Sequence, residues 1–135
     1  MNGMLLYRGL SQKYKRDEVG QHHPGPFLAT DFTDCPFAAL QYARGTNGML
    51  LVLEIPAEAM AGGNSRSLRV SKELWFPNGA GPQRYMVWGR FDEFLRAEIP
   101  AKILRAETRK KGVLGQPDQV KSTLLRKLIE EYIHD

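Results

Sequence analysis

Residues 25–43 read GPFLATDFTDCPFAALQYA, which predicts a short strand that breaks directly into a helix. We expect the strand over residues 27–30. The turn carries helix-start signals, because Asp34 or Cys35 can cap the helix and Pro36 falls in its first turn, where a missing N–H costs nothing. A strand end and the first N–H groups of a helix then face a cleft, and the rest of the chain is expected to form its walls.

Length and composition describe an ordinary globular protein. The 135 residues are enough for one domain with a proper core, and 42% hydrophobic with 25% charged residues argues against a disordered chain. The net charge of +4 favours anionic ligands in general. It is too weak to demonstrate nucleic-acid binding.

Metal sites, disulfides and membrane segments are not expected. Cys35 is the single cysteine, which excludes an internal disulfide and a cluster of cysteine ligands. His22 and His23 are adjacent, so their side chains point apart, and no carboxylate–histidine spacing accompanies them. The sequence shows neither a signal-peptide pattern nor a run of about 18 apolar residues, which predicts a cytoplasmic protein without a membrane segment.

The rest of the chain predicts a mixed α+β pattern. Residues 4–10 read as an apolar strand that carries an Arg-Gly pair near its end. Residues 49–55 form an almost continuous apolar run closed by Pro56, which predicts a strand buried on both faces. Strands are also expected over residues 85–88, 92–100 and 101–107, a short helix or extended segment over residues 68–75, and loops over residues 57–67 and 76–84.

The C-terminal residues predict a separate helix. Residues 110–117 contain glycine and proline and are expected as a linker that follows a domain of residues 1–109. Within residues 118–135, Asp118 is expected to cap an amphipathic helix whose apolar stripe repeats every three or four residues. That stripe packs either on the domain or on a second chain, so a protein partner or a homodimer stays open.

Three blocks in this order resemble the ADP-ribosyltransferase-like superfamily, the NAD-using toxins and transferases. They are LYRGL at residues 6–10, GPFLATD at residues 25–31 with the helix that follows, and FDEFLRAEIP at residues 91–100. The resemblance covers roughly residues 4–105. It implies a single α+β domain with two small, mostly antiparallel β-sheets around a central NAD cleft, flanking helices and the C-terminal amphipathic helix.

The implied activity is mono-ADP-ribosyl transfer from NAD to a protein or nucleic-acid acceptor, with release of nicotinamide. Breaking the nicotinamide–ribose bond creates an oxocarbenium-like centre, so a carboxylate must bind the ribose and stabilise positive charge. Glu93 matches the family's glutamate, and Glu98 is its rival because a register error of a few residues exchanges them. Phe91 stands where arginine-modifying members carry Gln or Glu, so modification of protein arginines is not expected.

Five further residues are implied to bind NAD. The planar guanidinium of Arg8, with Gly9 beside it, suits ribose or phosphate oxygens. Phe27 and Tyr42 offer aromatic faces to the nicotinamide ring. Thr30 matches the middle of the family's Ser-Thr-Ser pattern and would hold the two half-sheets in register.

Three other functions stay open at this point. An NAD glycohydrolase, with water as the acceptor, would use the same residues. An RNA 2′-phosphotransferase is disfavoured because the chain is short and lacks a separate basic RNA-binding domain. A non-catalytic binding module with a partner-docking C-terminal helix is motivated by Phe27 and Ala29, which depart from the family's middle motif.

Overall fold

One antiparallel sheet organises the computed structural model, which describes residues 3–11, 29–60, 68–73, 83–89, 91–112 and 115–134. Within these residues the sheet has six strands in the spatial order β4-β5-β2-β1-β3-β6, and every pairing between neighbours is antiparallel. The strands are β1 (Gly3–Leu10), β2 (Ala29–Thr33), β3 (Met49–Pro56), β4 (Leu68–Glu73), β5 (Arg84–Gly89) and β6 (Leu95–Pro100).

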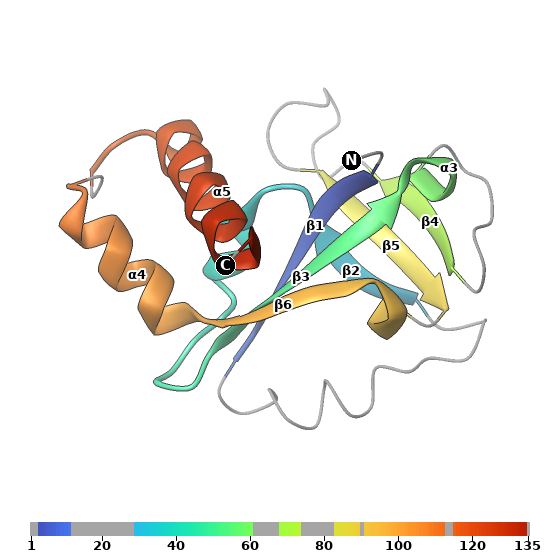
Figure 1. The fold of residues 1–135 in the computed structure, drawn as a ribbon, viewed down its shortest axis with the longest axis horizontal. Helices are drawn as coiled ribbons and strands as arrows, with labels where there is room; N and C mark the ends of the chain where they lie inside the picture. Colours follow the sequence, from blue (N-terminus) through green and yellow to red (C-terminus); the bar gives the residue numbers. More distant parts are fainter. Residues whose placement is uncertain are drawn as a thin grey trace.

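The helices lie in two places relative to the sheet (Figure 1). The long helices α4 (Ala101–Lys110) and α5 (Asp118–His134) pack together, and α5 also contacts the short helix α2 (Pro36–Leu40), which packs against β1. The short helix α3 (Ala57–Met60) and the 3-10 turn η1 (Phe91–Phe94) lie toward the other end of the sheet. The chain is therefore α+β, as the sequence predicts.

Strand β3 is the centre of the core, and its predicted burial on both faces is confirmed. Its residues Leu50, Leu51, Val52, Leu53 and Ile55 are each 1% exposed or less. On one face, β3 packs with the apolar residues of α2, α4 and α5; on the other, it packs with Leu6, Phe32, Tyr85 and their neighbours. A continuous apolar run in the sequence thus fills two separate core layers.

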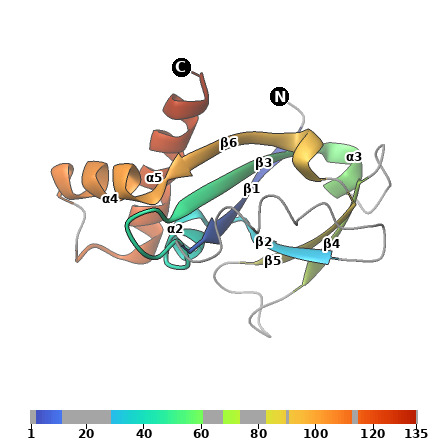
Figure 2. The ribbon, with the colours of Figure 1, turned by 90° about the horizontal axis from the view of Figure 1, so that it is seen from below.

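The two central strands of the sheet, β1 and β2, pair over a very short length. Strand β1 pairs with β3 along its whole length, from Gly3 opposite Pro56 to Leu10 opposite Met49, but it pairs with β2 at Tyr7 and Thr33 alone. Figure 2 shows β1, β3 and β6 in the upper part of the molecule and β2, β5 and β4 in the lower part. The prediction of two separate sheets is therefore wrong in detail: two three-stranded halves share one sheet, joined at a single residue pair.

Several sequence predictions of secondary structure need correction. Residues 101–107, expected as a strand, lie within α4, where Ala101 and Leu104 are buried three residues apart in helical spacing. The first part of the expected strand over residues 92–100 is the 3-10 turn η1. The start of the expected loop over residues 57–67 is the short helix α3. Residues 68–73 form strand β4, which agrees with the extended alternative predicted there.

Helix α5 confirms the predicted C-terminal helix, and its buried side faces this same chain. Leu125 and Ile129 are 1% and 0% exposed and belong to the core layer formed with β1, β3 and α2. Val120 and Tyr132 of the same helix stay exposed. No helix in the described ranges is both long and apolar enough to cross a membrane.

Candidate functional site

A cavity of about 330 Å³ lies where β1 and β2 separate beyond their single pair. We call this cavity the strand cleft. Helix α2 contributes to its wall because the chain turns from the end of β2 directly into this helix. Among the described residues, eight line the strand cleft: Tyr7, Arg8, Gly9, Asp31, Phe32, Thr33, Ala39 and Tyr42.

Arg8 spans the separation between the two strands. Its side chain is half-buried, and its Nη1 donates a hydrogen bond of 3.1 Å to the backbone carbonyl of Asp31 on β2. The Asp31 carboxylate accepts a hydrogen bond from Arg84 Nε at 3.0 Å and lies 3.0 Å from Arg84 Nη2. The cleft therefore places a fixed guanidinium beside an ion-paired carboxylate, a combination that binds ligand oxygens through the guanidinium.

Gly9 allows helix α2 to approach β1. A side-chain carbon at this position would overlap the backbone carbonyl of Ala39 and crowd the backbone nitrogen of Ala43. The close approach brings the end of α2 against the cleft, and Tyr42 follows just after the helix with 58% of its surface exposed. An exposed aromatic ring at the mouth of a cavity offers a stacking surface for a planar ligand.

A buried hydrogen-bond network holds the turn between β2 and α2. The hydroxyl of Thr33 donates to the carbonyl of Gln83 at 2.8 Å and accepts from the backbone N–H of Cys35 at 3.3 Å. The carboxylate of Asp34 accepts from the backbone N–H of Gln83 at 3.1 Å. Burial, and a hydrogen bond to the Asp34 carboxylate, raise the pKa of Tyr85 above its usual value. The network keeps the turn, and with it one wall of the cleft, in a fixed position.

Helix α5 supports the same turn from behind. Arg126 Nη2 donates to the carbonyl of Asp34 at 2.9 Å, and Cys35 Sγ lies 2.9 Å from the hydroxyl of Ser122. Burial raises the pKa of Tyr7 to about 12, against the opposing effect of the nearby Arg126 charge. The Tyr7 phenol therefore stays neutral at physiological pH.

The structure brings three of the predicted site residues together. Arg8, Gly9 and Tyr42 all line the strand cleft, although the first two and the third lie more than thirty residues apart in sequence. Thr30 lies in β2 opposite Val87, and its side chain is outside what the structure describes. Phe27, His22 and His23 also lie outside the described residues.

Glu93 does not join this group. It is exposed and lines a different cavity, of about 450 Å³, together with Gly3, Glu54, Pro56 and other residues. Gly3 is five residues from Arg8 along β1, so the backbones of these two residues are about 17 Å apart. The predicted catalytic carboxylate thus lies at the opposite end of β1 from the predicted NAD-binding residues.

Glu98 lies closer to Arg8 than Glu93 does. It stands on β6 opposite Leu51 of β3, and Leu51 stands opposite Arg8 of β1, so the three residues form one row across the sheet. Two strand spacings separate Arg8 from Glu98, about 10 Å between backbones. Glu98 is exposed and is not among the residues that line the strand cleft.

Sequence reasoning missed Asp31 as a site residue. It lies inside the quoted stretch, and it is the single carboxylate among the described residues that line the strand cleft. Its place on β2, two residues before Thr33, puts both side chains on the same face of the strand. The alternation of side chains between the two faces of a strand is the feature of the sequence that could have identified Asp31. No group of three or more metal-ligating side chains occurs in the part of the chain that the structure describes.

Comparison with protein-family models, with curated proteins and with solved structures gave no match to this chain. The function is therefore argued from the cleft and its residues.

Proposed function

We propose that the chain binds NAD in the strand cleft and transfers its ADP-ribose group to an acceptor, with release of nicotinamide. One observation carries the proposal: Arg8, Gly9 and Tyr42, which the resemblance to ADP-ribosyltransferases selects from distant parts of the sequence, line one cavity. Its volume of about 330 Å³ is at the lower end of the range for small-molecule sites. A cavity of this size holds one half of a dinucleotide and leaves the other half at its mouth.

The proposed roles follow from the chemistry of the side chains. The guanidinium of Arg8 binds ribose or phosphate oxygens of NAD in the interval between the two strands. Tyr42, exposed at the mouth, stacks on a planar ring of the ligand. Gly9 contributes its backbone and keeps α2 close enough for Tyr42 to reach the cleft.

The geometry ranks three carboxylates for the stabilisation of the developing positive charge. Asp31 lines the cleft, Glu98 lies about 10 Å from Arg8 in the same row, and Glu93 lies at the far end of β1. A carboxylate acts on the ribose only when it touches it, so Asp31 ranks first in this proposal. Its carboxylate lies 3.0 Å from Arg84 Nη2, which holds it at the wall of the cleft.

The test is the appearance of free nicotinamide from NAD with purified protein, followed by NMR. The proposal predicts release by the wild type and loss of at least tenfold in rate for Asp31→Asn, with Glu98→Gln and Glu93→Gln as parallel variants. Release that disappears in Glu93→Gln alone would contradict the ranking. Free ADP-ribose as the sole second product would identify water as the acceptor, and thus an NAD glycohydrolase.

A second candidate is a non-catalytic NAD-binding module on the same fold. It is favoured by the distance of Glu93 from the cleft and by the ion pair that already engages Asp31. This candidate predicts NAD binding that depends on Arg8 without any nicotinamide release. Both candidates fail if the wild type neither binds nor consumes NAD.

A further inference from the structure

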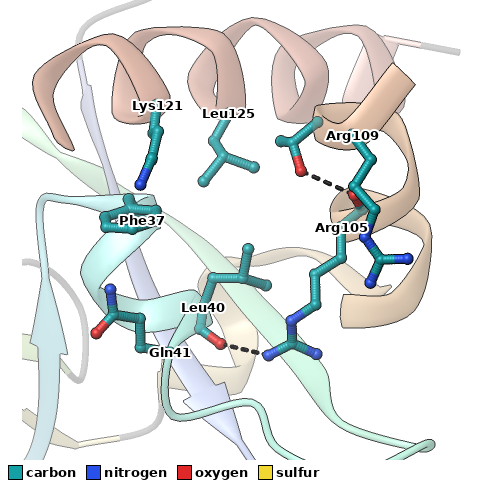
Figure 3. Close-up of a pocket in the computed structure, with 8 residues that line it drawn as sticks. Phe37, Leu40, Gln41, Arg105, Arg109, Lys121 and Leu125 are labelled. Carbon is teal, nitrogen blue, oxygen red and sulfur yellow. Dashed lines mark hydrogen bonds between the residues drawn. The ribbon is translucent and has the colours of Figure 1, made fainter. Parts of the chain in front are cut away.

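A second cavity, of about 320 Å³, lies between α2, α4 and α5. We call it the helix pocket. Figure 3 shows Phe37 and Leu40 on the α2 side and Leu125 pointing down from α5, so the three apolar side chains meet across the cavity. Leu40 and Leu125 are 6% and 1% exposed and form a fixed part of the core. The helix pocket therefore offers an apolar interior for a ligand.

Three cationic side chains surround this interior. Arg105 and Arg109 come from α4 and Lys121 from α5, and no carboxylate is among the described residues that line the pocket. Arg105 Nη2 donates to the carbonyls of Leu40 and Ala43, at 2.9 and 2.8 Å, which fixes the guanidinium at the pocket. Lys121 Nζ lies 4.9 Å from the centre of the Phe37 ring. Arg105 and Lys121 are thus held at the wall of an apolar cavity, and Arg109 lies exposed at its edge.

The surrounding segment carries the positive charge of the whole chain. Residues 101–127 contain eight Lys or Arg and two Asp or Glu, whereas the remaining residues contain eleven and thirteen. Residues 101–127 therefore have a net charge of +6 and the remaining residues a net charge of −2, which together give +4 for the chain. The field around the helix pocket attracts anions and repels cations.

We propose that the helix pocket binds a small amphipathic carboxylate, with its apolar body among Phe37, Leu40 and Leu125 and its carboxylate on Arg109. An engineered protein cavity of roughly 150 Å³ holds benzene, so twice that volume holds an organic body of about a dozen non-hydrogen atoms. The enclosure by three helices fits a compact ligand of this size. This site is separate from the strand cleft, and its occupant is independent of NAD.

The test uses decanoate, a ten-carbon carboxylate, titrated into the full chain by calorimetry at concentrations below those at which decanoate aggregates. Loss of one charge-assisted hydrogen bond weakens binding by about tenfold or more, so Arg109→Gln is expected to raise Kd by that factor. Lys127→Gln, which removes the same charge from an exposed position of α5 outside the pocket, is the matched control and is expected to change Kd less than twofold.

The ligand itself supplies the second control. Decyltrimethylammonium has the same apolar body with a cationic head, and we expect it not to bind. Equal binding of the two probes, equal loss in Lys127→Gln and Arg109→Gln, or no decanoate binding by the wild type would overturn the proposal. NAD binding by Arg109→Gln is expected to equal that of the wild type, which separates this result from any failure of the strand cleft.

Discussion

Replacement of Ile129 by alanine measures how firmly α5 is part of the domain. Ile129 is fully buried and packs in the core layer that α5 shares with β1, β3 and α2. The substitution removes three carbon atoms and leaves a cavity, which in protein cores costs about 2–5 kcal/mol. We take about 3 kcal/mol as the expected loss of unfolding free energy. With about 2.1 cal/mol/K of unfolding entropy per residue over 135 residues, the melting temperature falls by roughly 10 °C.

The assay is thermal and urea unfolding followed by circular dichroism at several protein concentrations. Val120→Ala, on the exposed side of the same helix, is the control and is expected to change the unfolding free energy by less than about 0.5 kcal/mol. A loss below about 1 kcal/mol for Ile129→Ala would refute the packing of α5 on its own sheet. A melting temperature that rises with protein concentration would instead place the helix against a second copy.

Three further substitutions test other parts of the structure. Gly9→Ala forces a side chain into the Ala39 carbonyl, and we expect a loss of about 1–3 kcal/mol or more in urea unfolding; an unchanged midpoint would contradict the close approach of α2. Burial raises the pKa of Tyr7 to about 12 in the folded protein, so the unfolded form releases this proton first and the stability of the wild type falls from pH 10 to pH 12, by up to roughly 2–3 kcal/mol. The unfolding free energy of Tyr7→Phe should lack this part of the fall, and identical pH profiles for the two proteins would contradict the prediction. Arg105→Ala removes the donors to two carbonyls at the end of α2 and is expected to cost about 2 kcal/mol, whereas Lys102→Ala on the exposed side of α4 should be near neutral; equal costs would show that these hydrogen bonds do not matter.

The strands with strong local signals could be predicted from the sequence. The apolar run ending at Pro56 predicts β3. Five large apolar side chains in succession are typical of a strand that is buried on both faces. The Pro36 signal likewise determines the start of α2. Both signals are local, so they do not depend on how distant parts of the chain pack.

Helix α4 shows where local reasoning was insufficient. The apolar pair Ile103 and Leu104 favours a strand, but the segment around it is rich in Ala, Lys, Arg and Glu, which favour helix. In the structure Leu104 is buried and Ile103 is 42% exposed, so a single helical face meets the core. Two adjacent apolar residues do not distinguish a helix from a strand, whereas the composition of the whole segment does.

The site was predicted in part. The sequence named Arg8 and Tyr42, and the fold brings both to the strand cleft because β1 and β2 separate just beyond Tyr7. It also named Glu93, which the register of β6 on β3 carries to the other end of β1. The register of β6 on β3 depends on tertiary packing. A bulge between Val52 and Leu53 also shifts the pairing of these two strands.

The proposed function requires that the strand cleft binds NAD through Arg8. The most direct measurement is an NAD titration of the wild type, of Arg8→Gln and of Arg44→Gln, which removes the same charge from an exposed position that does not line the cleft. We predict saturable binding by the wild type and by Arg44→Gln, and binding weaker by at least tenfold for Arg8→Gln with its melting temperature retained. Absence of binding by the wild type, or equal binding by all three proteins, would contradict the claim.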